Sequence, residues 1–343
     1  MLIYKIKDII RQVVCSILVR TGIYGLLVLT RKSVLTVLMF HRIYKYNNHL
    51  GLSISPDMFE ALLEYLSRKY NVISISEAVE SLKSGTLRRD AVVITFDDGW
   101  RDNYTHAFPL LKKYMLPAAI FVTVDAIESG VFGWNSFDQA ILDSHLIELD
   151  LSSFGLGKFP INNREQKISS ISQLHQKLKL LDNSVKLAVI NHVSSYYRGA
   201  SGERVMLSWQ EIKDMLASGL ITIGSHTLTH PIMTRIPLSQ AKFEIKESKR
   251  FIEEKTGAPV DFFAFPNGSN DDFNSEIIGL IAESGYKAAF STIPGINRDL
   301  SERYSLRRID VTYRMCQGVG GEFSKSMFAV KVSGAFQGIL FKS

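Results

Sequence analysis

Short apolar segments alternate with amphipathic segments along most of the chain. Runs of β-branched and aromatic residues bounded by turn residues predict buried strands at 33–40, 72–75, 91–96, 116–122, 221–224, 288–292 and 305–311. Hydrophobic positions and capping residues predict helices at 55–66, 76–82, 103–114, 239–255 and 274–284, and a further helix that begins at 208. Strand and helix in this order are typical of parallel β/α units, in which reactive side chains gather at the carboxyl ends of the strands.

Helix starts have recognisable capping residues. Ser55 precedes Pro56 and is a predicted N-cap. Ser208 with Glu211 three residues later forms a capping-box pattern, and Asn103 is the predicted cap of the helix that runs toward residue 114.

The first segment has a different pattern. From Leu2 to Val19, polar residues recur at helical spacing opposite a face of Leu, Ile and Val, which predicts an amphipathic helix. Arg11 and Arg20 interrupt the segment, and it has no stretch of about 18 apolar residues without a charge, so no transmembrane span is predicted. No cleavable export signal is evident either. Two interpretations stay open: a helix that lies in a membrane surface, and a helix packed on the protein's own core.

Residues 130–203 break the alternation of strands and helices. They contain an aromatic turn at 132–134 and helical stretches of mixed charge, but no chemical motif. We interpret them as an insertion, with a lid over the site as one role. Trp134 is a candidate for stacking on a sugar ring, and packing is the alternative. The expected organisation is an N-terminal helix at 1–32, a β/α domain at 33–315 and an apolar, basic tail at 316–343 that packs beside that helix.

Positive charge is concentrated at the N-terminus. Residues 1–45 contain eight Lys or Arg and one Asp, a net charge of +7, so the other residues carry −1 of the total of +6. A basic segment suits anionic lipid or phosphate as well as nucleic acid. No zinc finger, helix-turn-helix or RNA-binding aromatic motif is present, so we expect no nucleic-acid partner. Cys15 and Cys316 lack motif spacing, which excludes a disulfide framework and indicates a cytoplasmic protein.

Candidate chemistry follows three of the predicted strands. His41 follows 33–40, Asp97 and Asp98 follow 91–96, and His226 and His230 follow 221–224. Two acids after a strand also suit a polar turn that caps the next helix. Two histidines and one carboxylate, however, form a three-ligand set that leaves coordination positions open for water and substrate, which is typical of a catalytic metal site.

These segments resemble a known family. Residues 95–99 (Thr-Phe-Asp-Asp-Gly) and 225–231 (Ser-His-Thr-Leu-Thr-His-Pro) look like the first two motifs of the polysaccharide deacetylases, the NodB-homology carbohydrate esterases. Residues 263–268 resemble the third motif, and the likeness runs from about 34 to 311. The resemblance implies a distorted (β/α) barrel of about seven strands and hydrolytic removal of an acetyl group from an amino sugar.

The first two motifs imply roles for five residues. Asp98, His226 and His230 match the family's metal ligands, and Asp97 matches its general base. Thr227 matches a residue that supports the histidine loop. The expected cofactor is one divalent ion, Zn²⁺ first, with Co²⁺, Ni²⁺ or Mn²⁺ as alternatives. Such an ion acidifies a coordinated water, and a neighbouring carboxylate takes the proton as the water attacks the amide carbon.

The third motif implies a backbone hydrogen-bond donor for the oxyanion, and it lacks one residue of the family pattern. The family uses the backbone N–H that follows its proline, which here is Pro266, so the donor is Asn267. The family usually has an arginine two positions before that proline, where this chain has Ala264. An arginine that orients the base is therefore expected elsewhere, and Arg307 and Arg308 are the candidates.

The general acid is also displaced. No histidine follows His230, so the family's late Leu-x-His segment is missing. Some members carry an N-terminal Tyr-His motif, which residues 39–42 (Met-Phe-His-Arg) resemble. His41 is thus the candidate acid that protonates the leaving amine.

The expected function is metal-dependent N-deacetylation of an N-acetylhexosamine unit in a bacterial polysaccharide or a lipid-linked saccharide. Alternatives are a glycan-binding pseudoenzyme, a membrane-associated scaffold or an O-acetyl esterase. A glycoside hydrolase is disfavoured, because its two carboxyl groups converge on the bond from about 5 Å or more apart, which Asp97 and Asp98 as strand neighbours do not supply. The basic helix and the lack of an evident export signal predict a peripheral position at the inner face of the membrane, with an outward-facing membrane anchor as the alternative.

Overall fold

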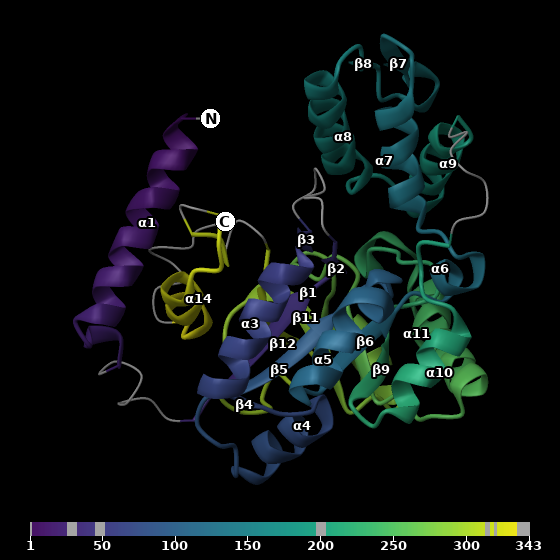
Figure 1. The fold of residues 1–343 in the computed structure, drawn as a ribbon. Helices are drawn as coiled ribbons and strands as arrows, with labels where there is room; N and C mark the ends of the chain where they lie inside the picture. Colours follow the sequence, from purple (N-terminus) through teal and green to yellow (C-terminus); the bar gives the residue numbers. More distant parts are fainter. Residues whose placement is uncertain are drawn as a thin grey trace.

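The computed structural model describes residues 2–25, 33–44, 52–196, 204–312, 316–318 and 321–334, with only the backbone for residues 2–8. Figure 1 shows a ring of strands enclosed by helices, a helical group over one end of the ring, and a long helix at the periphery.

Seven parallel strands close into a barrel, as the family resemblance implies, although the apolar pattern did not predict the strand at 262–264. They pair in the order β5, β1, β12, β11, β10, β9 and β6, which returns to β5. Their bounds are β1 Leu35–Phe40, β5 Ala91–Phe96, β6 Ala118–Val122, β9 Ile221–Ser225, β10 Phe262–Ala264, β11 Ala288–Pro294 and β12 Leu306–Asp310. The barrel is distorted at one side, because β10 has three residues and pairs with β9 only at Phe263 and Ser225, and the register shifts between β11 and β12.

Three short strands lie outside the ring. The strand predicted at 72–75 is reduced to β4, Asn71–Val72, which pairs with the start of β5. Beyond the carboxyl end of β1, β2 Arg42–Ile43 pairs in parallel with β3 Ser53–Ile54.

Helices surround the barrel, and the hydrophobic periodicity predicts all of them except α6, Val124–Ser129. Their bounds are α3 Pro56–Lys69, α4 Ile75–Ser84, α5 Phe108–Tyr114, α6 Val124–Ser129, α10 Trp209–Ala217, α11 Leu238–Thr256 and α12 Ser275–Glu283. The Ser55 hydroxyl accepts a hydrogen bond from the Met58 N–H at the start of α3. Ser208 and Glu211 form the reciprocal capping box of α10. Both predicted caps are confirmed.

The predicted Asn103 cap is wrong. A π-helical turn, Asn103–Ala107, precedes α5, and Asn103 is buried in it. Its Nδ2 donates to the carbonyl oxygen of His41 at 2.9 Å, and the neighbouring Asp102 accepts from Nε of Arg42 at 2.8 Å. The loop after β5 therefore uses its polar side chains to fix the end of β1 instead of capping a helix.

Residues 133–194 form a helical group between β6 and β9. It consists of α7 Gly133–Asp143, the antiparallel pair β7 Glu148–Asp150 and β8 Lys158–Pro160, α8 Arg164–Leu178 and α9 Asn183–Ser194. The group has its own apolar cluster, which includes Phe137, Leu174 and Val189. In Figure 1 it stands over the end of the barrel near β2 and β3.

The N-terminal helix packs against the C-terminal segment. α1, Leu2–Arg20, lies beside α14, Lys325–Val332, and buried Cys15 contacts Met327 and Val330 in a small apolar cluster. Packing of the tail beside this helix is therefore confirmed. Cys15 and Cys316 are both free thiols. Among the described residues, no helix has the length and apolar character needed to cross a bilayer.

Candidate active site

The polar residues that follow β1, β5 and β9 line one cavity of about 730 Å³. His41 enters it from the end of β1, Asp97 and Asp98 from β5, and His226 and His230 from the loop after β9. Parallel strands in a closed barrel bring their carboxyl ends to one rim, which explains why segments far apart in the sequence meet here.

Strained backbone is concentrated at this rim. Among the described residues, six non-glycine residues have positive φ, and four of them belong to the site: Asp98 at 73°, Thr227 at 69°, His230 at 60° and Asn267 at 59°. Positive φ is rare for residues with a Cβ and especially for β-branched threonine, with a cost of about 1–3 kcal/mol each. Gly99 continues the turn after Asp98 with a φ of 86°. The surrounding fold therefore holds these residues in backbone conformations that an unconstrained loop would avoid.

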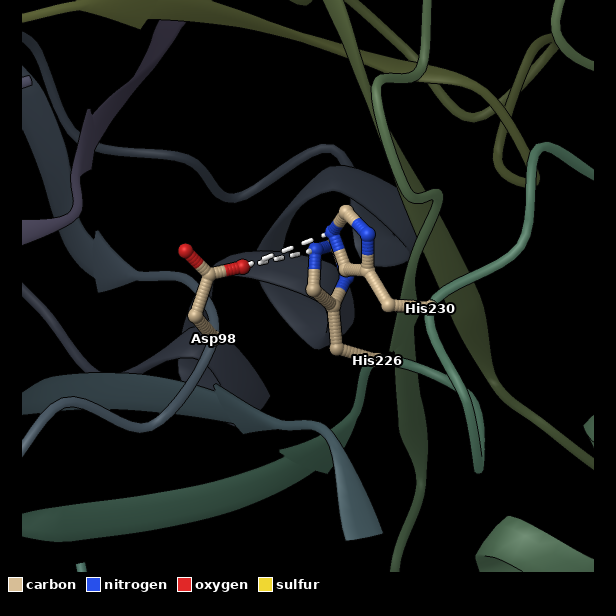
Figure 2. Close-up of side chains that lie close together, drawn as sticks. All are labelled: Asp98, His226 and His230. Carbon is tan, nitrogen blue, oxygen red and sulfur yellow. Dashed lines mark ion pairs between the residues drawn. The ribbon is translucent and has the colours of Figure 1, made fainter. Parts of the chain in front are cut away.

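Asp98, His226 and His230 form a compact set of metal-ligating atoms. Oδ1 of Asp98 lies 3.6 Å from Nε2 of His226 and 3.5 Å from Nε2 of His230, as Figure 2 shows. No two of the ligand atoms are more than 4.8 Å apart. The two separations exceed a normal N–H···O hydrogen bond. Two ligand atoms that each lie about 2.1 Å from one ion, at a tetrahedral angle, are about 3.4 Å apart. The two separations match this value.

The two histidines are oriented from the side away from Asp98. Nδ1 of His226 lies 2.8 Å from the carbonyl oxygen of Ala264, so Nδ1 carries the proton and Nε2 presents its lone pair to Asp98. Burial lowers the pKa of His226 to about 4, so its imidazole is neutral near pH 7. The backbone N–H of His230 donates to Oγ1 of Thr227 at 3.0 Å, which is the supporting contact expected of Thr227.

Trp100 holds the second oxygen of Asp98, a contact that the sequence did not predict. Its Nε1 donates to Oδ2 of Asp98 at 2.9 Å, which leaves Oδ1 facing the histidines. The guanidinium of Arg42 lies 4.3 Å from the centre of the Trp100 ring and pairs with Asp102. Burial would raise the pKa of Asp98, but the nearby imidazoles, His230 first and then His41 and His226, outweigh that effect and hold the pKa well below its usual value. Asp98 is therefore held as a carboxylate.

Arg308 orients Asp97. Its Nη1 and Nη2 lie 2.7 Å from Oδ1 and Oδ2 of Asp97, and its Nε donates to the carbonyl oxygen of Ser291 at 2.8 Å. Burial raises the pKa of Asp97, but the charge and hydrogen bonds of Arg308, together with nearby His226 and His41, outweigh that effect and lower the pKa. Arg307, the other candidate from the sequence, is wrong for this role: its partly exposed guanidinium lies 3.6 Å from Glu302.

The third motif reaches the same cavity. Asn267 lines it, and the carbonyl oxygen of Asn267 accepts from Oγ1 of Thr292 at 2.5 Å. Pro266 is buried directly before it, and its carbonyl oxygen accepts from the Gly268 N–H at 2.7 Å. The Asn267 N–H forms no hydrogen bond with another described residue. Among the described residues this N–H therefore has no hydrogen-bond acceptor, as its assignment to the oxyanion requires.

The model of the polysaccharide deacetylase family matches residues 84–289, which is more than half of the chain. This chain belongs to the polysaccharide deacetylase family. The matched segment contains Asp97, Asp98, His226, His230 and Asn267. Members of the family are hydrolytic deacetylases, so the chain is an enzyme of this class.

Individual relatives agree with the family. The Bacillus subtilis protein named "Putative polysaccharide deacetylase YxkH" is 24% identical over 295 residues, covering 85% of this chain and 77% of the relative. A Staphylococcus aureus poly-β-1,6-N-acetyl-D-glucosamine N-deacetylase is 34% identical over 71 residues, 20% of this chain and 24% of that protein. The structure of the Streptococcus pyogenes deacetylase PplD in complex with acetate has a TM-score of 0.59 at 18% identity and covers 88% of this chain and 99% of that one; it supports the fold.

In this deacetylase the helical group at 133–194 forms the far wall of the cavity. Trp134 is half-buried there, with its ring centre 4.6 Å from that of His175. Nε2 of His175 lies 2.6 Å from Oδ1 of buried Asp138. Sequence reasoning found Trp134 but not the pair of Asp138 and His175, because the two belong to different helices and share no motif. This wall of the cavity therefore contains the ring of Trp134, which packs on the hydrogen-bonded pair of His175 and Asp138.

Proposed function

We propose that this deacetylase is a metal-dependent N-deacetylase of N-acetylhexosamine units in a bacterial glycan. The observation that carries the proposal is the ligand set Asp98, His226 and His230 in one cavity with Asp97, which Arg308 orients. The name of the Staphylococcus aureus relative, a poly-β-1,6-N-acetyl-D-glucosamine N-deacetylase, supports the sugar and the bond.

The donor set fits a divalent ion. It offers two imidazole nitrogens, of which His226 Nε2 has its lone pair available, and one carboxylate oxygen that Trp100 leaves free. Imidazole and carboxylate ligands suit Zn²⁺, which is our first choice, and also Co²⁺, Ni²⁺ or Mn²⁺. When bound, such an ion supplies Lewis-acid activation of water and polarisation of the acetamido carbonyl.

The protein's own groups account for the proton transfers. Asp97 accepts a proton from the water that attacks the acetyl carbon, and Arg308 keeps its carboxylate ionised and aimed. The Asn267 N–H donates to the carbonyl oxygen as negative charge develops on it. His41, which also lines the cavity, gives a proton to the sugar nitrogen as the C–N bond breaks. The products are acetate and the free amino sugar.

The wall formed by the helical group is the proposed sugar-binding surface. The ring of Trp134 is large, rigid and half-buried, and its packing on His175 limits its motion. An apolar ring face suits the C–H face of a hexose, while the polar groups around it suit the hydroxyls. This arrangement supports Trp134 as the sugar-stacking residue of the insertion.

The test is acetate release by protein loaded with Zn²⁺, measured on free, polymeric and lipid-linked N-acetylated sugars. Asp97→Asn should retain one equivalent of metal and lose acetate release, whereas His226→Ala should lose both. Asp299→Asn, an exposed acid away from the cavity, is the control and should behave as wild type. Full activity of Asp97→Asn would reject the mechanism. Glycan binding by metal-loaded wild type without any acetate release would indicate a binding protein instead of an enzyme on these substrates.

A further inference from the structure

The N-terminal helix has two apolar faces, and the described residues cover only one of them. Cys15 is buried on the face that packs against α14, where it contacts Met327 and Val330. The other face carries four large aliphatic side chains, which we call the α1 stripe: Ile9, Ile10, Val13 and Ile17 are 45%, 57%, 51% and 53% exposed. Figure 1 shows α1 beside α14 at the periphery of the molecule.

The α1 stripe is continuous along the helix. Val13 follows Ile9 by four residues and Ile10 by three, and Ile17 follows Val13 by four, so the side chains are neighbours on one face. Ile23, just past the end of α1, is 48% exposed as well. Single exposed hydrophobic residues are ordinary on a protein surface, but a contiguous aliphatic face marks an interaction site. No described residue covers this face.

The charge of the segment selects the partner. Residues 1–45 carry eight basic residues and one acid, whereas the rest of the chain has a net charge of −1. Arg20 is exposed at the end of α1. A second copy of this chain would bring two strongly cationic segments together, which is unfavourable, whereas an anionic surface complements the charge. An aliphatic face on a basic helix is the pattern of a helix that lies in the interface of an anionic bilayer.

The composition of the helix agrees with this orientation. Arg11 and Arg20 interrupt its apolar residues, so the helix fits along the surface instead of across the bilayer. We propose that the α1 stripe inserts into the surface of an anionic lipid bilayer and holds the protein there. This is the peripheral location expected from the sequence, and it does not depend on the metal or on the sugar.

Vesicle binding by the full chain tests the proposal. Wild type, a stripe variant and a control variant are sedimented with vesicles of phosphatidylcholine alone or with phosphatidylglycerol added. The stripe variant is Ile10→Gln, Val13→Gln and Ile17→Gln, since glutamine is a good helix former. The control is Met115→Gln, Ile147→Gln and Phe243→Gln, which replaces side chains that are 72%, 71% and 60% exposed elsewhere on the molecule. Circular dichroism and acetate release verify that all three proteins are folded.

We expect wild type and control to bind phosphatidylglycerol vesicles at least about tenfold more tightly than neutral vesicles, and salt to weaken this binding. The stripe variant should bind at least about tenfold more weakly than wild type. In wild type the aliphatic side chains of the α1 stripe move from water into the bilayer, and the glutamine side chains lack this favourable transfer. Equal binding by wild type and stripe variant would overturn the proposal, and so would the absence of wild-type binding. A wild-type dimer that the stripe variant converts to monomer, without vesicle binding, would assign the face to a second copy.

Discussion

Arg308 on β12 binds both carboxylate oxygens of Asp97, which follows β5. The two strands are separated by β1 alone. The two N–O distances are 2.7 Å each, and both side chains are buried. The third donor of Arg308 is bound to the Ser291 carbonyl oxygen, so the guanidinium has one fixed orientation. A planar, doubly bonded contact of this kind sets the direction of the carboxylate as well as its charge, which a lysine at the same place would not do.

Arg308→Lys should therefore lower kcat/KM for acetate release by about a hundredfold while metal content stays at the wild-type level. Arg308 is a cause of the lowered pKa of Asp97, so weakening the contact raises that pKa. Asp97 must be ionised to accept a proton, and the acidic limb of the pH profile should consequently move to higher pH. The profile of kcat/KM against pH measures this shift.

Arg307→Lys is the matched control for that measurement. Arg307 is adjacent, partly exposed and paired with Glu302 outside the cavity, so both its rate and its profile should equal those of wild type. An unchanged acidic limb in Arg308→Lys, together with normal kcat/KM, would show that Asp97 does not depend on this arginine.

Trp100→Phe should weaken metal binding. The substitution keeps an aromatic ring but removes the indole N–H that fixes Oδ2 of Asp98. Partners that orient a metal ligand typically contribute 10–100-fold to affinity, and we expect a loss of about that size. Competition with a chelator of known affinity measures it. The control is Trp209→Phe, which removes an indole N–H bonded to Glu128 on the surface and should leave metal affinity unchanged. Equal affinities of wild type and Trp100→Phe would contradict the assigned contact.

The barrel and the ligand set could be predicted because their signals are local. Six of the seven barrel strands are apolar runs with their own boundaries, β10 being the exception, and Asp97, Asp98, His226 and His230 lie directly after two such runs. Parallel β/α topology then brings these ends to one rim without further information. Asp98 and His230 also needed positive φ, which the sequence did not reveal, because neither is a glycine.

The remaining contacts depend on tertiary geometry. Neighbours on a strand face opposite sides, so one of Arg307 and Arg308 had to point into the barrel, but their charge is the same and the sequence alone left both open. Asn103 had the composition of a cap, yet the carbonyl of His41 from another strand was a better partner. Asp138 and His175 meet only because α7 and α8 pack together. Tertiary packing determines such pairs, and no local sequence pattern predicts them.

Trp134→Ala should raise KM for N-acetylated oligosaccharides by about tenfold with little change in kcat, because the ring is the proposed contact for the sugar and not for the reacting bond. Trp134→Phe, which keeps a ring face, should fall between wild type and alanine. Initial rates on a series of oligosaccharides give both constants. A fall in kcat at constant KM would place Trp134 in the chemistry and not in binding.

His41→Gln should separate proton donation from the rest of the reaction. An amine leaves poorly without a proton, so loss of the acid should slow acetate release from N-acetylglucosamine oligomers by about 10²–10⁴-fold. Nitrophenolate leaves without a proton, and hydrolysis of 4-nitrophenyl acetate by the same variant should fall by less than about tenfold. Rates on the two substrates, measured with equal metal content, give the comparison.

His106→Gln serves as the control for His41→Gln, because His106 is exposed on the π-helical turn outside the cavity and should not affect either substrate. The ratio of the two rates is decisive, since a general fault in folding or metal loading lowers both rates alike. If His41→Gln slows amide and ester equally, His41 orients the site and another group supplies the proton. If it slows only the amide, the histidine at the end of β1 is the acid that replaces the missing late histidine.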